Sequence, residues 1–391
     1  MNDFNQARQF ALTAEQQAIH NLAASFAQEK IAPYAIQWDR DKFFPLHVVR
    51  SAATLGFGGI CVAEDTGGSQ MSRLEAVLIY DGLAAACPCI AGYFSVHNMV
   101  AFIVDTFGNQ QQRRQWLPSM CSLELLGAYC LTEPSSGSDA AALSTRATTE
   151  GGHYILNGVK QFISGAGDAD LYVVMARTGP AGPRGISAFV VEKGVAGLSF
   201  GPIEKKMGWN AQATRQVILD GVRIPAENLL GAEGSGFSIA MTALDGGRLN
   251  ISACSLGGAR AAMNKARAYM QERLAFGRRL AEFQALQFRL ADMATELEVA
   301  RTFLWRAASA LDAQEPNATI LCAMAKRFVT DTGFHVANEA LQLFGGYGYL
   351  ADYGVEKIVR DLRVHQILEG TNEIMRVIIA RSLLDPQSQV K

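Results

Sequence analysis

The spacing of apolar and polar residues changes twice along this chain of 391 residues and divides it into three parts. Up to about residue 128 the pattern is helical, and Thr13 followed by Gln16 is typical of a capped helix start. Pro33, Pro45 and Pro118 separate the helical stretches. From about 129 to 233 the period is two, as in strands, and from about 235 the helical period returns. This order, without alternation of single strands and helices, predicts an α+β protein.

Two turns are expected in the middle part. Asn157-Gly158 lies between two apolar runs, and Asn-Gly in that setting is typical of a β-hairpin because both turn residues take a positive φ. Asp220-Gly221 is the second expected turn. Strands are expected on both sides of these turns and at 171–175, 186–191 and 216–219.

One apolar stripe dominates the last part. From Leu286 to Leu311, apolar residues recur at alternating steps of four and three, with one step of seven at the end, which predicts a long helix buried in a bundle. Further helices are expected at 256–273, 318–344 and 372–384. The glycines of 231–236 (GAEGSG) come where the β part ends, so we interpret them as an interdomain loop and not as a dinucleotide fingerprint. Those of 345–348 are interpreted as a helix C-cap.

Composition excludes several classes of protein. Charged residues are 18% and apolar residues 49% of the chain, which excludes a disordered protein, and the net charge of −2 gives no general attraction to nucleic acid. The seven cysteines form no C-x-x-C pair, so we expect reduced thiols and no metal site. Residues 82–104 could span a bilayer by length, but Pro88, His97 and Asn98 favour a buried helix pair and no membrane insertion. The N-terminus lacks a secretory or transit pattern, which predicts a cytoplasmic protein.

Glu369 is the most suggestive candidate for chemistry. It follows an apolar pair and precedes Gly370, which permits close approach by a ligand. A carboxylate among apolar groups has a raised pKa and can act as a general base. The alternative is a solvated loop residue before a last helix capped by Thr371, and on pattern alone that alternative is favoured.

Three other segments could bind a ligand, each with a plain structural alternative. The hydroxyls and amides of 129–139 could bond a ring edge or a phosphate, or form an ordinary loop. Phe162 could stack on a flat cofactor, or pack in the core. Asp245 and Arg248 could hold the two ends of a long substrate, or pair with each other. Arg273 closes a helix, where an Arg commonly complements the helix dipole.

Six motifs in a fixed order carry a resemblance to a known family. They are YCLTEPSSGSD (129–139), KQFISGA (160–166), EGSGF (233–237), R-x-x-F-G (273–277), QLFGGYGY (342–349) and ILEGTNEIMR (367–376). Through them the chain resembles the acyl-CoA dehydrogenase family over nearly its whole length. The resemblance implies an N-terminal helical domain (1–128), a middle β-barrel-like domain (129–233) and a C-terminal four-helix bundle (234–391).

The resemblance also implies an activity. Members remove two hydrogens from the α and β carbons of an acyl-CoA, with FAD as cofactor and electron-transfer flavoprotein as acceptor. Glu369 would take the α-proton, while its own backbone N–H would help to polarise the thioester carbonyl. The bundle segments resemble members that act on short, α-branched substrates. A homotetramer, built as a dimer of dimers, is implied as well.

Binding residues are implied by the same motifs. Contacts with FAD are implied for Tyr129, Leu131, Thr132, Gly137, Ser138, Phe162, Ile163, Ser164, Thr371, Asn372 and Glu373. Contacts with the FAD of a neighbouring subunit are implied for Arg273, Phe276, Phe283, Gln284, Gln342, Leu343, Phe344, Gly345 and Gly346. Acyl-CoA contacts are implied for Ser138, Asp245, Gly246, Gly247, Arg248 and Gly370.

The chain departs from the family pattern at two places. Some relatives carry the base on the helix that holds Asp245, where this chain has Gly246 and Gly247, so Glu369 is the candidate base. Several relatives have Trp at the position of Phe162. Two other classes remain open, an acyl-CoA oxidase and a non-catalytic helical scaffold.

Overall fold

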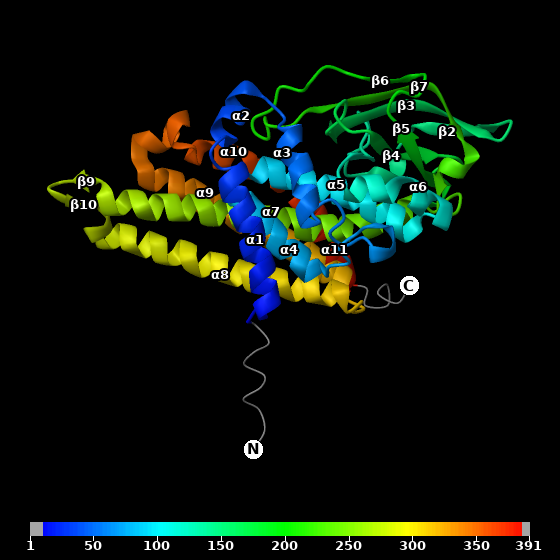
Figure 1. The fold of residues 1–391 in the computed structure, drawn as a ribbon. Helices are drawn as coiled ribbons and strands as arrows, with labels where there is room; N and C mark the ends of the chain where they lie inside the picture. The colour runs from blue at the N-terminus through cyan, green and yellow to red at the C-terminus, as the bar shows by residue number, and fades with distance from the viewer. Residues whose placement is uncertain (1–10, 385–391) are drawn as a thin grey trace.

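The computed structural model describes residues 11–384 and has a helical N-terminal part, a sheet and a long helical C-terminal part (Figure 1). The prediction about leader sequences rests partly on residues 1–10, which lie outside the described residues. The N-terminal helices are α1 (Ala14–Lys30), α2 (Ala35–Asp41), α3 (Leu46–Ser51), α4 (Arg73–Ala84), α5 (Pro88–Phe107) and α6 (Gln110–Cys121).

The capped start of α1 is confirmed, because the Thr13 side chain accepts from the Gln16 N–H and the Gln16 side chain accepts from the Thr13 N–H. Pro118 was expected to separate helices, but it lies inside α6. Among residues 11–384, α5 alone is long and apolar enough to cross a membrane, and 72% of its apolar window is buried in the protein. The prediction of a buried helix pair at 82–104 is therefore confirmed.

The sheet contains eight strands in the order β6-β7-β3-β2-β4-β5-β8, with β1 paired to β4. The strands are β1 (Gly127–Cys130), β2 (Arg146–Glu150), β3 (His153–Ser164), β4 (Leu171–Arg177), β5 (Ile186–Glu192), β6 (Leu198–Phe200), β7 (Thr214–Pro225) and β8 (Leu229–Leu230). Along β4 alternate side chains enter two different apolar cores, Tyr172 and Val174 one of them and Val173 and Met175 the other. Because successive side chains of a strand point to opposite faces, the residues of β4 alternate between the two cores with a period of two.

Both expected turns are wrong. Asn157-Gly158 lies inside the single strand β3, and Asp220-Gly221 lies inside β7. The two pairs face each other where the register shifts, and the Gly221 N–H donates to Asn157 Oδ1 at 2.8 Å. A Cβ on Gly158 would lie 2.4 Å from Thr145 Oγ1, so glycine here permits the close approach of a neighbouring segment. The glycines serve a β-bulge between long strands, which local sequence does not distinguish from a turn.

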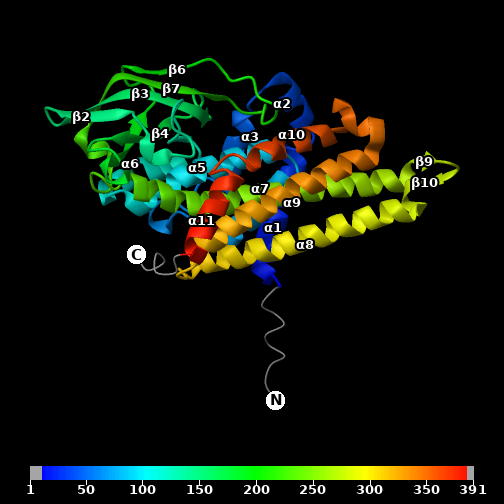
Figure 2. The same ribbon diagram turned by 180° about the vertical axis from the view of Figure 1, so that it is seen from behind.

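The C-terminal part contains α7 (Gly236–Glu272), α8 (Gln284–Asp312), α9 (Ala318–Phe344), α10 (Val355–His365) and α11 (Asn372–Leu384). Helices α7, α8 and α9 run alongside one another, and α10 and α11 pack on α9 (Figures 1 and 2). A small hairpin, β9 (Leu274–Ala275) and β10 (Arg278–Arg279), joins α7 to α8 at the end of the molecule farthest from the sheet (Figures 1 and 2).

The predicted helices at 318–344 and 372–384 are confirmed, and the apolar stripe lies on α8. The start predicted at 256 is wrong, because α7 already begins at Gly236. Glycines weaken a helix by about 1 kcal/mol each. In α7 they allow close packing: a Cβ on Gly257 would lie 2.2 Å from the Asp81 carbonyl oxygen of α4. Burial in the bundle therefore extends a helix that local propensity does not favour.

Candidate active site

Glu369 lies in the short loop between α10 and α11. Both Glu369 and Gly370 have a positive φ, 56° and 89°, which is uncommon for a residue with a side chain. The residue is half-buried, but its carboxylate oxygen Oε2 is fully buried and has no hydrogen-bond partner. Burial raises the pKa of Glu369 to about 7, against the opposing effect of the positive charges of Lys326 and Arg248. The alternative of a solvated loop carboxylate does not fit this geometry.

The carboxylate faces α7 at a position without a side chain. A Cβ on Gly247 would lie 2.7 Å from Glu369 Oε2 and 3.3 Å from Met99 Sδ. Two more polar atoms close by are buried without partners, the hydroxyl of Tyr129 and Nε of Arg248. Burial also raises the pKa of Tyr129, and the charge of Glu369 adds to that shift. Three unsatisfied polar groups from β1, α7 and the 366–371 loop thus converge where a polar ligand would satisfy them.

Arg248 and Asp245 do form the local pair that was the alternative reading, with Nη1 to Oδ1 at 2.6 Å. The other Asp245 oxygen accepts from the Thr319 hydroxyl at 2.7 Å. Both residues are buried on α7, and Gly247, which lies between them in the sequence, faces the Glu369 carboxylate. The pair therefore fixes Arg248 near Glu369 without excluding a ligand contact through Nε.

The segment after β1 is held by a buried ion pair. Lys160 Nζ donates to Glu133 Oε1 at 2.7 Å and to the Leu131 carbonyl at 3.1 Å, and both side chains are almost fully buried. Glu133 also accepts from the backbone N–H groups of Ser144 and Thr145. The pKa of Glu133 is lowered to about 2, since Lys160 and these hydrogen bonds outweigh the effect of burial. Residues 131–133 are thereby fixed beside β3.

Phe162 lies at the end of the same strand. Its side chain is 64% exposed and its φ is +58°, so the core-packing alternative does not fit. Ile163, next along the strand, is buried. Gly137 has open space where a Cβ would be, and Ser138 is exposed. An exposed aromatic beside exposed small residues is a suitable surface for a flat, polar-edged ring.

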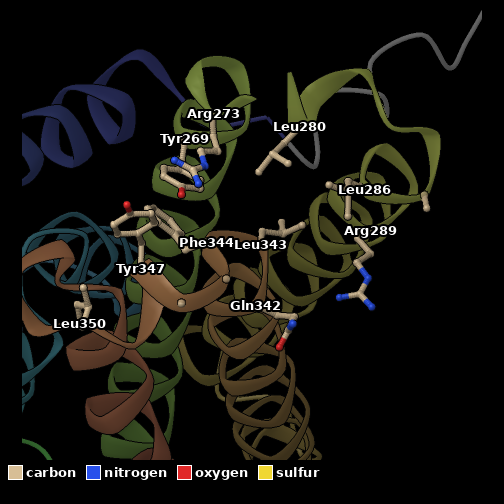
Figure 3. Close-up of a pocket in the computed structure, with 13 residues that line it drawn as sticks. Tyr269, Arg273, Leu280, Leu286, Arg289, Gln342, Leu343, Phe344, Tyr347 and Leu350 are labelled. Atoms are coloured by element: carbon tan, nitrogen blue, oxygen red, sulfur yellow. The ribbon is translucent and has the colours of Figure 1, made fainter. Parts of the chain in front are cut away.

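A second group of predicted residues lies far from Glu369, at the β9–β10 end of the long helices (Figures 1 and 3). A cavity of about 640 Å³ lies here, and its walls include Tyr269 and Tyr347. Of the predicted residues, Arg273 and 342–346 line it, whereas Phe276, Phe283 and Gln284 do not. Tyr269 stacks on Phe344, and the Arg273 guanidinium lies over the Tyr347 ring at 5.3 Å. In the described chain no carboxylate pairs with Arg273.

The members of this distal group differ in conformation and in exposure to solvent. Gly345 ends α9 as its C-cap, with φ +58°, as the glycine pattern predicted. A Cβ on Gly345 or Gly346 would meet open space. Phe276 is 96% exposed at the hairpin tip, while Leu343 and Phe344 are buried. Phe283 is half-buried, and Gln284 and Gln342 are exposed.

Comparison with known proteins now bears on this geometry. The models of the N-terminal, middle and C-terminal domains of acyl-CoA dehydrogenase match residues 13–124, 128–222 and 234–384. The chain belongs to the acyl-CoA dehydrogenase family. It is 54% and 52% identical over 373 residues to the mitochondrial isobutyryl-CoA dehydrogenases of Dictyostelium discoideum and Bos taurus, covering 95% of this chain and 90% of each relative. The structure of butyryl-CoA dehydrogenase from Megasphaera elsdenii matches with a TM-score of 0.93 at 37% identity, over 96% of this chain and all of that one.

Like the other acyl-CoA dehydrogenases, this chain is an FAD-dependent oxidoreductase. Its residues fit a flavin for two reasons. The exposed ring of Phe162 lies beside the polar 131–133 segment, which offers a surface for the flavin ring. Arg273, which pairs with no carboxylate in residues 11–384, offers a cation for a phosphate. Among the residues with implied FAD contacts, Asn372 is tied into the protein by its side chain. It is buried, and its amide bonds Lys326, Thr330 and Asp331 inside the protein.

Sequence reasoning missed two buried lysines that support the site, Lys160 and Lys326. A signal for Lys326 was available. It stands four residues after Cys322 and three before Val329, on the apolar face of the predicted helix 318–344, where a charge needs a specific partner. Its partners come from the Glu369 loop.

Proposed function

We propose that this acyl-CoA dehydrogenase oxidises a short, α-branched acyl-CoA, with isobutyryl-CoA converted to methacrylyl-CoA, and that Glu369 is its base. The observation that carries the proposal is the carboxylate of Glu369, which is buried, unpartnered and directed at the empty Cβ position of Gly247. The branched substrate is supported by the identity of over 50% to two isobutyryl-CoA dehydrogenases.

The loop around Glu369 offers both groups that proton abstraction requires. The α-proton of a thioester is weakly acidic, so the carbonyl must be polarised as charge develops on its oxygen. In the described residues the backbone N–H of Glu369 has no hydrogen-bonded acceptor, which leaves it available to a substrate carbonyl. The carboxylate takes the α-proton. Bound FAD supplies the acceptor for the hydride that leaves the β-carbon.

The pKa of Glu369 suits this task. A base with a pKa of about 7 is largely ionised just above neutral pH and still holds a proton strongly. Acyl-CoA is proposed to contact Ser138, Asp245, Gly246, Gly247, Arg248 and Gly370. Of these, Gly247 has no side chain at the point that faces the Glu369 carboxylate, which leaves room there for the acyl group.

We further propose that one protomer supplies the flavin-ring surface and its neighbour the Arg273 cavity. The proposal is supported by the separation of the two groups in a single chain (Figure 1) and by exposed apolar residues at the far end, Leu274, Phe276 and Tyr349. Such residues are typical of interfaces between subunits. The expected assembly is a homotetramer built as a dimer of dimers.

Replacing Arg273 by Ala tests this arrangement. The variant should lose FAD during gel filtration and shift toward smaller assemblies, because a cofactor shared between subunits stabilises their association. Sedimentation velocity with detection at 280 nm and 450 nm measures both properties. A monomer that keeps its flavin would contradict the shared site.

Electron-transfer flavoprotein is proposed as the electron acceptor, on the family resemblance. The compartment is proposed to be the one that holds this acceptor and the acyl-CoA pool. The sequence pattern predicts the cytoplasm, whereas both curated relatives are named as mitochondrial proteins. Cell fractionation with an antibody distinguishes the two.

A panel of substrates tests the reaction itself. We expect isobutyryl-CoA to have the highest kcat/KM, followed by 2-methylbutyryl-CoA, with butyryl- and isovaleryl-CoA slower and octanoyl-CoA slowest. One methylene in an apolar pocket is worth roughly 1–3 kcal/mol, so neighbouring substrates should differ about 10–200-fold. Glu369→Gln should keep FAD and lose turnover. A higher kcat/KM for octanoyl- or isovaleryl-CoA than for isobutyryl-CoA would overturn the substrate assignment. Turnover in Glu369→Gln would overturn the assignment of the base, and stoichiometric oxygen uptake would identify an oxidase.

A further inference from the structure

A lysine without an ionic partner is buried next to the loop that carries Glu369. Lys326 lies on α9, and its side chain is completely inaccessible to solvent. In the described residues its ammonium group forms no ion pair, although a buried ammonium group is costly unless it is paired and hydrogen-bonded. Nζ instead donates to the carbonyl oxygen of Gly370 and to Asn372 Oδ1, both at 2.8 Å.

These two acceptors lie on either side of Thr371: Gly370 belongs to the Glu369 loop, and Asn372 is the first residue of α11. The Asn372 amide continues the network by donating to Thr330 Oγ1 at 3.0 Å and to Asp331 Oδ1 at 2.7 Å, and both acceptors lie on α9. The loop is thereby tied to α9 at several points. Such anchoring is needed because the left-handed conformation of Glu369 is strained and persists only where the surroundings impose it.

Lys326 also acts on Glu369 through its charge. Its positive charge is the larger of the two that lower the pKa of Glu369 against burial, the other being that of Arg248 on α7. Burial in turn lowers the pKa of Lys326 to about 8. Other titratable groups around the pair are Tyr80 on α4, Tyr129 on β1, Cys254 on α7, His365 on α10, Asp331 on α9 and Glu373 on α11.

We propose that Lys326 is the positioning residue of the base: it anchors the loop through Gly370 and Asn372, and its positive charge favours the ionised form of the Glu369 carboxylate against the effect of burial. The inference rests on the proposed role of Glu369 as base. Lys326 itself is completely buried, so its effect on the reaction is exerted through Glu369.

Two replacements separate the anchor from the charge. Lys326→Met removes both the hydrogen bonds and the charge, and Lys326→Gln removes the charge but keeps a donor. Lys265→Met is the matched control, because Lys265 is an exposed lysine on α7. All variants are purified with FAD, and kcat and KM for isobutyryl-CoA are measured from pH 6 to 9.5 with a chemical electron acceptor.

We expect the ascending limb of kcat to move up by about one pH unit in Lys326→Met and Lys326→Gln, as for loss of a neighbouring opposite charge. With the base titrating near pH 7, kcat at pH 7 then falls about fivefold, with KM little changed. Lys265→Met should behave as wild type. Independently of turnover, hydrogen exchange of the FAD-free protein should show lost amide protection at 366–372 in Lys326→Met, because the Asn372 N–H bond to the Gln366 carbonyl is part of the anchored loop.

If the ascending limb of the kcat–pH profile does not shift in folded, FAD-containing Lys326→Gln, the role of the charge is overturned. If amide exchange at 366–372 is unchanged in Lys326→Met, the role of Lys326 in anchoring the loop is overturned. Failure of the proposed function has a different signature. In that case the flavin absorbance of the wild type is not bleached by any short acyl-CoA, or Glu369→Gln retains turnover. If another short acyl-CoA is the better substrate, the same pH series is run with it.

Discussion

Glu369 should make the folded protein less stable as the pH rises, and Glu369→Gln should remove that loss. The pKa of the carboxyl is about 7 in the folded protein against a value of 4.5 without the fold. Below pH 4.5 the group is protonated in both states and costs nothing. Between pH 4.5 and 7 the unfolded chain releases the proton while the folded protein retains it, so stability falls with rising pH. Above pH 7 the loss is complete.

The size of the loss follows from the two pKa values. One pKa unit corresponds to about 1.4 kcal/mol, so the whole shift amounts to about 3 kcal/mol above pH 7. For a chain of 391 residues this is a difference of roughly 4 °C in Tm. The new amide of Gln adds a cost of its own, since Glu369 Oε2 has no partner, but that cost does not depend on pH.

The measurement is the Tm of wild type and Glu369→Gln, both with FAD, from pH 5 to 8.5. Because part of the loss is already present at pH 5, the difference in Tm should change by about 3 °C in favour of the variant across that range. Glu227→Gln is the matched control, because Glu227 is exposed and should give a constant difference. A Glu369→Gln difference that stays constant with pH would refute the reasoning, since it would mean that the carboxyl titrates alike in both states.

Three further changes test how the site is built. Gly247→Ala places a methyl group where only 2.7 Å separates it from Glu369 Oε2, so kcat should fall roughly 100-fold with FAD retained, and near-normal turnover would contradict the contact. Lys160→Met leaves Glu133 buried without its cation and should lower the free energy of unfolding by about 3–5 kcal/mol and loosen FAD, as measured by denaturant titration and flavin fluorescence. The double variant Lys160→Met/Glu133→Leu should regain most of that stability, and no recovery would mean that the pair is not the cause.

The amino-acid sequence by itself determined the features that depend on neighbours along the chain. The capped helix start at Thr13, the apolar stripe of α8 and the ranges of α9 and α11 follow from local spacing, and local spacing predicted them. The order of six motifs was sufficient for the family and, through it, for Glu369 as the candidate base. Pattern alone favoured a solvated loop at that residue.

Only the tertiary structure decided what depends on distant segments. Gly158 and Gly221 read locally as turns, but the strands around them pair with each other, so the glycines form a bulge. The early start of α7 depends on close packing that its glycines permit against α4 and the Glu369 loop. The raised pKa of Glu369 needs burial together with the charges of Lys326 and Arg248, residues 43 and 121 positions away in the chain. Burial and charge act through space, so no local pattern around Glu369 could have distinguished a solvated carboxylate from a base.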